Sequence, residues 1–399
     1  MISLKYILSR IKDVKIKDYL SLAPMSIALI IRPFFKKRYS DYWLICEKPA
    51  EARDNGYVFF KFLTQNTKQK CIYAIKRNSP DYQKVKTLGE TIQFGSIMHW
   101  VIYFSSKYNI SSQKGGKPNA ALCSFFELNG AFKPRNIFLQ HGVTINNVKW
   151  LYSEKSRIEV FITSTNQETK YIKGNFGYPE ESIQCTGMPR LDEYANIEAN
   201  KKQIIIMPTW RYWFNLKSKR DKKIESNFSK SDYYTKWKQL LESKELNDII
   251  NNKGFEVIFY LHRNLQRYSP LFKKIKTSAT IANWKDYDIR DLLKESSAMI
   301  TDYSSVFFDM VYMKKPIIFY QFDKKQYRKM QYEKGYFDYD NNVFGNSYDE
   351  YRGVCRELIE IIKNNFKPSK SFIEKHANTF PHHDTKNCYR IYRLLKGRE

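Results

Sequence analysis

Two histidines in this chain follow apolar segments in positions that suit proton transfer. His141 comes after NIFLQ and precedes Gly142, and His262 comes after FEVIFYL. Near neutral pH an imidazole can accept a proton from a hydroxyl, which is the task of a general base. A lone histidine is more often structural, so each is a candidate only. Their equivalent positions at two predicted strand ends favour a pair that faces one cleft.

A run of hydroxyl and carboxyl side chains follows a third apolar segment. After the apolar residues 298–300 the sequence reads TDYSS and then takes the amphipathic pattern of a helix. Hydroxyls and unpaired backbone N–H groups would meet at the start of that helix, which favours a phosphate or a pyrophosphate. Asp302 or Ser304 could instead simply cap the helix. Both interpretations stay open at this stage.

Two arginines stand near predicted strand ends or domain joins. Arg211 closes the motif PTWR, where its planar guanidinium suits bidentate contact with phosphate. A surface arginine in a loop explains Arg211 equally well. Arg190 lies in GMPRLDEY, near the middle of the chain. A salt bridge between domains and a ligand contact are both open for Arg190.

Short apolar runs alternate with amphipathic stretches, which predicts strands alternating with helices. The runs are YWLICEK, KCIYAIKR, NIFLQHG and VFITST before residue 197, and QIIIMPTW, FEVIFYLH, SAMITDYSS and KPIIFYQFD after it. Helices between buried strands imply mostly parallel sheets, whose ligands lie beyond the carboxyl ends of the strands. We therefore predict an α/β fold with two Rossmann-like domains, 41–197 and 198–399, facing a central cleft. The second domain is expected to end in a helix that can pack back across the halves.

The composition favours an anionic partner. Lys and Arg number 68 against 41 Asp and Glu, a formal net charge of +27. Such a surface attracts nucleic acid, anionic lipid or phosphate-rich polymers. The six cysteines are far apart without a CxxC pair, and the histidines lack a metal-ligand spacing. We expect reduced thiols, no protein-held metal and no cofactor.

Residues 1–40 are predicted to form a membrane-associating segment. An uncharged stretch from Tyr19 to Ile31 contains Pro24 and is shorter than the roughly 20 apolar residues that span a bilayer. It also lacks a small-residue cleavage site. Basic residues mixed with Phe34 follow, which suits a helix in the interface of an anionic membrane. A helix packed on its own domain is the alternative.

Taken together, the motifs resemble the CDP-glycerol glycerophosphotransferases of teichoic acid and capsule synthesis. The motifs are QHG, GMPRLD, PTWR, YLHRN and ITDYSSVFFDMVYMKKPIIFY, and they follow one another in that family's order. The resemblance implies a GT-B architecture, with the acceptor on the first domain and the CDP donor on the second. It implies transfer of glycerol phosphate, or another alditol phosphate, from a CDP-alditol to a hydroxyl of a membrane-bound polyanionic glycopolymer or lipid-linked acceptor. CMP would be released at the cytoplasmic face of a bacterial membrane, where the enzyme would be peripheral.

The resemblance also implies roles for individual residues. His141 would be the base, and His262 would bind or neutralise the donor pyrophosphate. The implied donor-binding residues are Thr209, Arg211, Thr301, Asp302, Ser304, Ser305 and Asp309. Of these, Asp302 and Asp309 would position the loop or the alditol, and Gly142 and Arg190 are further candidates. Phosphoryl transfer needs mainly positioning and charge neutralisation, so no covalent nucleophile is required.

Some positions depart from the family pattern and leave the alditol and the acceptor open. Gln140 precedes the His-Gly pair, VTINN follows it, and Arg263 follows His262. The alternative enzyme is a GT-B glycosyltransferase that uses a nucleotide sugar, and donor turnover separates the two. The positive charge also permits nucleic-acid binding. Because no groove-reading helix or aromatic RNA platform is evident, we expect no nucleic-acid partner.

Overall fold

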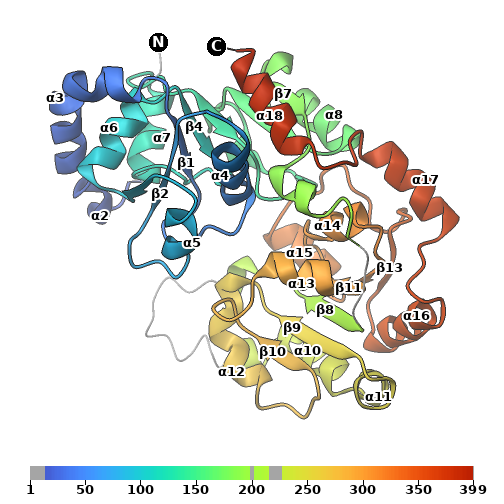
Figure 1. Ribbon diagram of the computed structural model, residues 1–399. Coiled ribbons are helices and arrows are strands. Elements are labelled where there is room, and N and C mark those ends of the chain that lie inside the picture. Colours follow the sequence, from blue (N-terminus) through green and yellow to red (C-terminus); the bar gives the residue numbers. More distant parts are fainter. Residues whose placement is uncertain (1–13, 198–201, 215–226, 399) are drawn as a thin grey trace. The chain divides into compact units, whose positions relative to one another are not determined.

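The chain forms two compact α/β units in the computed structural model, which describes residues 14–197, 202–214 and 227–398 (Figure 1). Unit 1 comprises Met1–Val143, Lys149–Asp192 and Asp384–Glu399, and unit 2 comprises Thr144–Val148 and Glu193–His383. Each unit is built on its own parallel sheet. The predicted α/β fold with two Rossmann-like domains is therefore confirmed.

The sheet of unit 1 has the strand order β3-β2-β1-β4-β5-β6-β7. Its strands are β1 (Trp43–Cys46), β2 (Cys71–Ile75), β3 (Thr91–Gln93), β4 (Tyr108–Ser111), β5 (Asn136–Phe138), β6 (Val160–Thr163) and β7 (Ile183–Cys185). All neighbouring pairs are parallel. The direction of winding reverses between β1 and β4, and ligands of such sheets bind beyond the carboxyl ends of the strands at this switch point.

Helices cover both faces of this sheet. They are α2 (Ile16–Tyr19), α3 (Leu22–Tyr39), α4 (Asn55–Asn66), α5 (Tyr82–Lys86), α6 (Ile97–Ser105), α7 (Ala120–Leu128), α8 (Asn166–Asn175) and α18 (Asn387–Lys396). Successive residues of a strand point to opposite faces. Accordingly, Trp43 and Ile45 pack in the cluster that includes α4 and α18, whereas Leu44 and Cys46 pack in the cluster that includes α3, α6 and α7.

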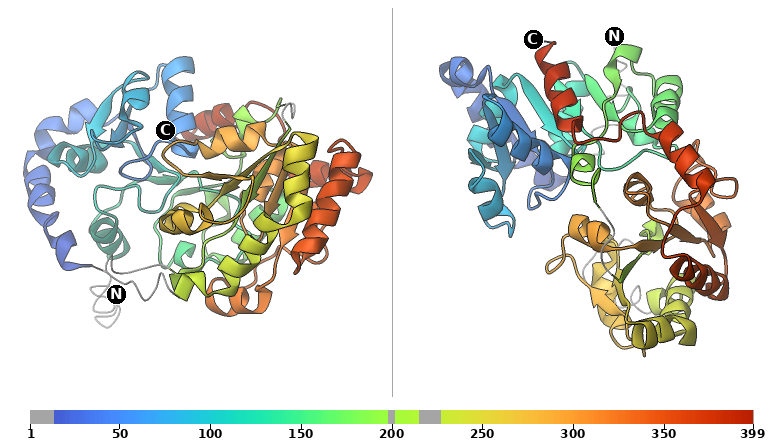
Figure 2. Two further views of the ribbon diagram at one scale, coloured as in Figure 1. Left: turned by 90° about the horizontal axis from the view of Figure 1, so that it is seen from below. Right: turned by 45° about the vertical axis from the view of Figure 1, so that its right-hand side comes forward.

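The terminal helix α18 lies in unit 1, which corrects the prediction that residues 198–399 form one domain. Cys388, Ile391 and Leu395 are buried in the same cluster as Trp43. The Tyr108 hydroxyl also donates a hydrogen bond to the Leu395 carbonyl at 3.1 Å. Both views in Figure 2 keep this red helix with the blue and cyan segments of unit 1. The helix belongs there because its apolar face completes the unit 1 core.

The sheet of unit 2 has the strand order β10-β9-β8-β11-β12-β13 and is also parallel throughout. Its strands are β8 (Gln203–Met207), β9 (Glu256–Tyr260), β10 (Thr280–Ala282), β11 (Ala298–Thr301), β12 (Ile317–Tyr320) and β13 (Gly345–Tyr348). Its helices include α10 (Asp232–Glu242), α11 (Lys244–Lys253), α12 (Ser269–Phe272), α13 (Ile289–Glu295), α14 (Phe307–Tyr312), α15 (Lys324–Met330), α16 (Tyr351–Lys363) and α17 (Lys370–Thr379). The winding reverses between β8 and β11, so unit 2 has its own switch point.

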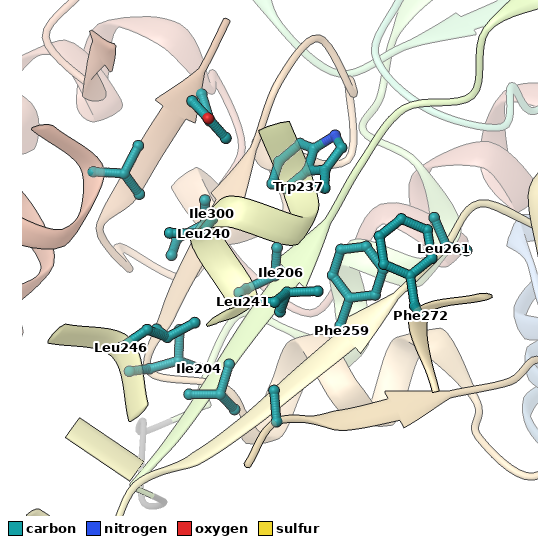
Figure 3. Packing of buried hydrophobic residues seen from close by; sticks show 14 of the residues in the cluster. Ile204, Ile206, Trp237, Leu240, Leu241, Leu246, Phe259, Leu261, Phe272 and Ile300 are labelled. Atoms are coloured by element: carbon teal, nitrogen blue, oxygen red, sulfur yellow. The ribbon is translucent and has the colours of Figure 1, made fainter. Parts of the chain in front are cut away.

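Helix α10 supplies much of the apolar packing on one face of the unit 2 sheet (Figure 3). Trp237, Leu240 and Leu241 stand three and four residues apart, so they share one side of the helix. They are fully buried together with Ile204 and Ile206 of β8. Burial of each such side chain stabilises the fold by about 1.5–3 kcal/mol, which fixes β8 and the loop after it.

Helix α3 packs on α6 but leaves part of its surface open. Met25 and Ala28 are buried in the cluster shared with α6. Ile27, Ile30 and Phe34 are exposed, with exposed fractions of 44%, 72% and 84%. Their spacing of three and four residues places them on one side of the helix, and we call them the exposed α3 face. Within the described part of the chain, no helix is long and apolar enough to cross a membrane.

Candidate active site

The turn after β5 presents His141 at the carboxyl edge of the unit 1 sheet. Gln140 has a φ of 62°, a left-handed conformation that is uncommon outside glycine. Its side-chain amide donates to the Ile162 carbonyl at 2.7 Å and to Glu168 Oε1 at 2.9 Å, and its own carbonyl accepts from Asn55 Nδ2 at 2.8 Å. These bonds hold the strained backbone, and the next side chain, His141, is 62% exposed.

A carboxylate orients the His141 ring. Nδ1 of His141 lies 2.5 Å from Oδ2 of Asp54. A carboxylate at this distance accepts the Nδ1 proton, which leaves the lone pair of the neutral ring on Nε2. The sequence analysis did not identify Asp54. Its position just before α4 is typical of a helix cap, yet its side chain makes no capping hydrogen bond and contacts His141 instead.

Asp54 is held in its ionised form by its neighbours. Burial alone would raise its pKa, but the charge and hydrogen bond of His141, with the charge of Arg190, more than offset burial and keep that pKa well below its usual range. Nη1 of Arg190 donates to Asp54 Oδ1 at 3.0 Å and to the His141 carbonyl at 2.7 Å. The amide of Gln113 donates to Asp54 Oδ2 at 3.2 Å.

Arg190 therefore has a positioning role within unit 1. Of the two interpretations left open by the sequence, a salt bridge is observed, but it joins Arg190 to Asp54 inside one unit. The Arg190 backbone N–H also donates to Asn55 Oδ1 at 2.9 Å. These contacts connect three segments that lie far apart in the sequence, so Arg190 fixes Asp54 and His141 together.

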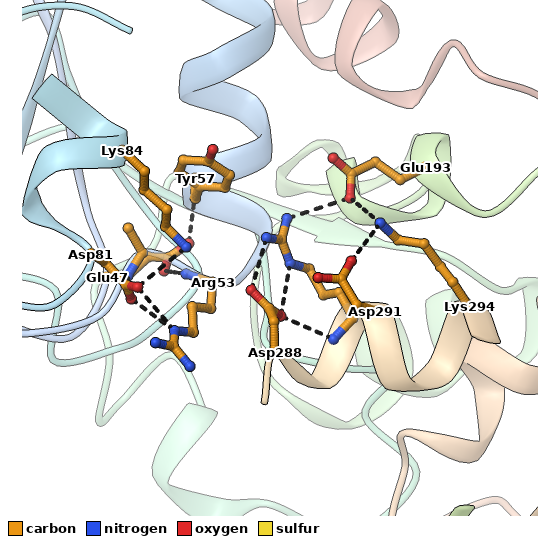
Figure 4. A network of polar contacts seen from close by, with 11 residues as sticks. Glu47, Arg53, Tyr57, Asp81, Lys84, Glu193, Asp288, Asp291 and Lys294 are labelled. Atoms are coloured by element: carbon orange, nitrogen blue, oxygen red, sulfur yellow. Dashed lines mark hydrogen bonds and ion pairs between the residues drawn. The ribbon is translucent and has the colours of Figure 1, made fainter. Parts of the chain in front are cut away.

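A second polar network fixes the loop between β1 and α4 that ends in Asp54 (Figure 4). Buried Glu47 accepts hydrogen bonds from the backbone N–H groups of Arg53 at 3.0 Å and Tyr57 at 2.7 Å. The Arg53 guanidinium pairs with Asp81 at 2.9 Å. Because Arg53 immediately precedes Asp54, these contacts limit the positions that the Asp54 carboxylate can take.

The predicted donor residues of unit 2 follow adjacent strands. Thr209 and Arg211 follow β8, His262 follows β9, and Ser304 and Ser305 follow β11. β8 pairs in parallel with both β9 and β11, so these segments meet at one edge of the sheet. This edge includes the switch point of unit 2. The two serines are partly buried at the start of the segment that leads into α14.

Arg211 holds this edge together from the interior. Its guanidinium is fully buried and contacts Asp302 at 2.7 Å and Asp323 at 2.7 Å. Burial would lower the pKa of Arg211, but the two carboxylates raise it well above its usual value. The ring faces of Tyr233, Tyr303 and Tyr327 surround the guanidinium at 4.9, 5.2 and 5.0 Å. Arg211 thus links the ends of β8, β11 and β12. Direct contact of its guanidinium with a phosphate would require its ion pairs with Asp302 and Asp323 to break.

Thr301, Asp302 and Asp309 are also directed into the protein. The Thr301 hydroxyl donates to the Met207 carbonyl at 2.7 Å, and Asp302 Oδ1 accepts from the Thr209 N–H at 2.8 Å. Asp309 is buried in α14. This geometry agrees with the implied role of Asp302 in positioning the loop. Contact with the donor remains a prediction for two of these residues, Thr301 and Asp309. It also remains a prediction for Thr209, Ser304 and Ser305.

His262 has the geometry of a hydrogen-bond donor. Its Nδ1 accepts from the Asn264 N–H at 3.2 Å, so in the neutral ring the proton lies on Nε2. The ring stacks on Trp210 with centroids 6.0 Å apart. An N–H on Nε2 can donate to a phosphate oxygen, whereas the opposite tautomer favoured at His141 accepts a proton. The two histidines thus differ in the hydrogen bond that fixes each ring.

No group of three or more His, Cys, Asp or Glu side chains suited to a metal ion occurs in the part of the chain that the structure covers. Each unit gathers its own polar side chains at strand ends: an imidazole, a carboxylate and an arginine in unit 1, and an imidazole, hydroxyls, carboxylates and an arginine in unit 2. Two Rossmann-like units, each with polar side chains gathered at its switch point, define a GT-B-like enzyme of nucleotide-linked group transfer.

Comparison with known proteins narrows this class to a family. Residues 30–397 match the family model described as CDP-Glycerol:Poly(glycerophosphate) glycerophosphotransferase. The chain belongs to this family. The resemblance inferred from the QHG, GMPRLD, PTWR and TDYSS motifs is therefore confirmed.

Several curated relatives are proteins of teichoic acid synthesis. The minor teichoic acid biosynthesis protein GgaB of Bacillus subtilis is 30% identical over 88% of this chain and 39% of its own length. The teichoic acid poly(glycerol phosphate) polymerase of Staphylococcus epidermidis is 24% identical over 87% of this chain and 47% of its own length. The chain thus spans less than half of these two relatives. The teichoic acid glycerol-phosphate transferase of Staphylococcus aureus is 22% identical over 89% of this chain and 88% of its own.

Solved structures support the fold. A variant of the wall teichoic acid polymerase TagF aligns over 96% of this chain and 98% of that chain, with a TM-score of 0.64 and 17% identity. MnaA of S. aureus, in a structure with UDP, aligns over 90% and 96% with a TM-score of 0.54 and 12% identity. At these identities the likeness shows the fold alone, which is GT-B-like with two Rossmann-like units.

Proposed function

We propose that the chain transfers an alditol phosphate, with glycerol phosphate as the first candidate, from a CDP-alditol to a hydroxyl of a membrane-bound glycopolymer or lipid-linked acceptor. Family membership supports the reaction class over the alternative of sugar transfer from a nucleotide sugar. The names of the relatives, which include glycerol-phosphate and ribitol-phosphate enzymes, leave more than one alditol as a candidate.

The observation that carries this proposal is the His141–Asp54 pair. Nε2 of His141 would accept the proton of the acceptor hydroxyl while Asp54 balances the charge that develops on the ring. The acceptor oxygen would form a bond to the phosphorus that bears the alditol. The bond between that phosphorus and the bridging pyrophosphate oxygen would break, and the electron pair would leave with CMP. The product would be a phosphodiester.

Unit 2 would stabilise the donor. The sheet edge at the ends of β8, β9 and β11 carries several hydrogen-bond donors. They are the side chains of Thr209, His262, Ser304 and Ser305. Hydrogen-bond donors directed at a pyrophosphate neutralise charge that increases as CMP departs. Arg211 and Asp302 would act through the loop that they hold, rather than by touching the reacting atoms.

Release of CMP by the purified chain tests the proposal. The assay would offer CDP-glycerol, CDP-ribitol and common nucleotide sugars together with a crude membrane fraction as acceptor. We expect acceptor-dependent CMP release from a CDP-alditol, reduced about 100-fold or more in His141→Ala because the general base is lost. His382→Ala is the matched control and should retain activity. Turnover of a nucleotide sugar alone would reassign the reaction.

We further propose peripheral attachment to the cytoplasmic face of the membrane through the N-terminal segment. The exposed α3 face presents Ile27, Ile30 and Phe34, and exposed Lys36, Lys37 and Arg38 follow in the last turn of the same helix. Apolar side chains beside basic ones suit the headgroup region of an anionic bilayer. Residues 1–13 of the predicted segment lie outside the described residues.

A further inference from the structure

Unit 1 contains a pocket between its sheet and α7 that is separate from the exposed ring of His141. Its volume is about 30 Å³. The walls are formed by β4, β5, the last turns of α7 and the two segments 113–117 and 155–158. Because a single water needs about 10–15 Å³, the pocket has room for about two water-sized groups, such as the hydroxymethyl of a polyol.

The sheet face that lines this pocket is polar where a covered sheet is normally apolar. On the same face, β1 and β2 contribute Leu44, Cys46, Ile72 and Ala74 to the apolar cluster beneath the helices. In β4 and β5 the corresponding positions are occupied by Asn109, Ser111 and Asn136, which line the pocket. Polar side chains beneath a helix lower stability unless they have partners. Asn109 and Ser111 have partners in Tyr103 and Gln113, so an unmet demand for a ligand can come only from Asn136.

The pocket carries more positive than negative charge. Its lining contains the cations Lys114, Lys117, Lys155 and Arg157 and one carboxylate, Glu127. Buried Glu127 is paired with Lys117 at 2.5 Å. Lys114 donates to the Trp150 and Lys155 carbonyls, and Lys155 pairs with Glu154, which lies outside the lining, at 3.3 Å. Arg157 is exposed and donates to the Glu127 carbonyl at 3.4 Å, and the lining as a whole keeps an excess of cations. This balance favours an anion.

One buried oxygen indicates that the ligand also carries hydroxyl groups. The amide nitrogen of Asn136 donates to Glu127 Oε2 at 3.1 Å and to the Arg157 carbonyl at 2.9 Å, which fixes the orientation of the amide. Its Oδ1 is buried and has no hydrogen-bond partner among the described residues. An unpaired buried acceptor is unfavourable and is satisfied by a donor such as a hydroxyl.

The pocket is connected to the candidate base. Gln113 lines the pocket, and its side-chain amide donates to Asp54 Oδ2, the oxygen that faces His141. Gln113 follows β4 and Asp54 follows β1, the two strands at the switch point of unit 1. A ligand in the pocket would therefore be linked, through Gln113, to the carboxylate that orients His141.

We propose that this pocket binds a hydroxymethyl group of the acceptor polyol, with the adjacent phosphate at its exposed rim, as a subsite for a unit behind the one that reacts. The inference rests on the proposed function, because it assigns the ligand to the acceptor. Arg157 and Lys155 bind the phosphate, and Asn136 Oδ1 accepts from a polyol hydroxyl. A glycerol phosphate repeat carries both groups.

Binding measured by calorimetry on the full chain tests the subsite. The probes are a synthetic trimer of glycerol phosphate, inorganic phosphate and vesicles containing phosphatidylglycerol. The test variant is Lys155→Gln with Arg157→Gln, and the matched control is Lys68→Gln with Lys133→Gln, which removes the same charge from exposed positions of unit 1. We expect the test variant to bind the trimer about tenfold more weakly or worse, and the control to bind it like the parent.

The outcomes separate the sources of the ligand. Equal weakening in the test and control variants would overturn the subsite, since only general charge would then matter. Equal affinity for inorganic phosphate and trimer would overturn the polyol contact. Binding of vesicles that depends on Lys155 and Arg157, without binding of the trimer, would assign the pocket to a lipid headgroup instead. Since the readout is binding, failure of every donor to release CMP would reject the proposed reaction independently.

Discussion

At the scale of single residues, the candidate base depends on a carboxylate that does not cap its own helix. Asp54 stands at the start of α4 but makes no capping hydrogen bond, and its side chain contacts His141, Arg190 and Gln113. Its lowered pKa keeps it ionised. The ring of His141 is thereby held in the tautomer that accepts a proton on Nε2.

Replacement of Asp54 by Asn should remove this control with little change in volume. We expect CMP release to fall about 100-fold, mainly in kcat, because an amide can also favour the wrong tautomer of His141. Steady-state kinetics with varied CDP-alditol would separate kcat from KM. Asp54→Glu should recover part of the loss, and Asp232→Asn, at an exposed carboxylate, should change nothing. An unchanged kcat in Asp54→Asn would contradict the role.

The sequence predicted the residues at strand ends better than their partners. His141 and His262 are where the apolar runs indicated, because each motif contains both the strand and the histidine. Asp54 was missed because its position matches a helix cap and its partner His141 is 87 residues away. The interior role of Arg211 was missed for the same reason, since Asp302 and Asp323 are 91 and 112 residues away.

At the scale of elements, α6 has a histidine in its apolar interior. His99 is fully buried, and its Nδ1 accepts from the Gly95 N–H at 3.0 Å. Burial lowers the pKa of His99 from 6.5 to about 3. The ring therefore stays neutral in the folded protein at pH values where an exposed histidine is protonated.

This shift predicts a loss of stability on acidification. Because the pKa of His99 is lower in the folded state, only the unfolded state binds this proton between pH 6.5 and about 3. The free energy of unfolding is therefore fully retained above pH 6.5 and decreases as the pH falls through this range. Urea unfolding at pH 6.5 and 5.5 should show that wild type loses about 1 kcal/mol more than His99→Gln, which cannot titrate there. His382→Gln should retain the wild-type slope. Parallel slopes for wild type and His99→Gln would contradict the assignment.

The strands within strongly apolar runs were predicted, whereas strands without such a run were not. The predicted runs correspond to β1, β2, β5, β6, β8, β9, β11 and β12. β4 was not predicted because Asn109 and Ser111 interrupt its apolar pattern. These two residues line the pocket against α7. The edge strands β3, β7, β10 and β13 are short or polar. Pairing with a neighbouring strand, rather than local composition, makes them strands.

At the scale of the whole molecule, neither unit is one continuous stretch of chain. Unit 1 takes its last helix from the end of the described sequence, and unit 2 takes residues 144–148 from within the first half. The sequence predicted two domains but placed a single boundary between them. Local patterns give the type of each element, whereas the unit in which α18 is buried depends on long-range packing.

Truncation of Ile391 in α18 should destabilise unit 1, although it lies far along the chain from the strands it covers. Ile391→Ala is expected to lower the free energy of unfolding by about 2–5 kcal/mol, because it leaves a cavity in the core with Trp43. Hydrogen exchange should show lost protection in β1 and β4. Ile373→Ala, at a side chain that is 38% exposed, should have little effect. Lost protection confined to unit 2 would contradict the packing.

Attachment to membranes is predicted to depend on the exposed α3 face. Ile30→Glu with Phe34→Glu should reduce co-sedimentation with anionic vesicles at least tenfold, because it replaces exposed apolar side chains by charges of the lipid's own sign. Neutral vesicles should bind wild type more weakly than anionic ones. Glu245→Gln with Asp248→Asn provides a control outside α3. Vesicle binding that is unaffected by the α3 substitutions would reject this surface.

The placement of α18 has a consequence for the order in which the protein matures. During translation, the strands of unit 1 emerge first, but Trp43, Tyr108 and their neighbours keep an uncovered apolar face until residues 384–398 have been made. Unit 2 has all of its own segments once residue 383 has been made. Domains commonly fold in the order of synthesis. Here the unit that carries His141 is expected to be completed last, so the candidate base would be assembled only after the unit 2 sheet exists.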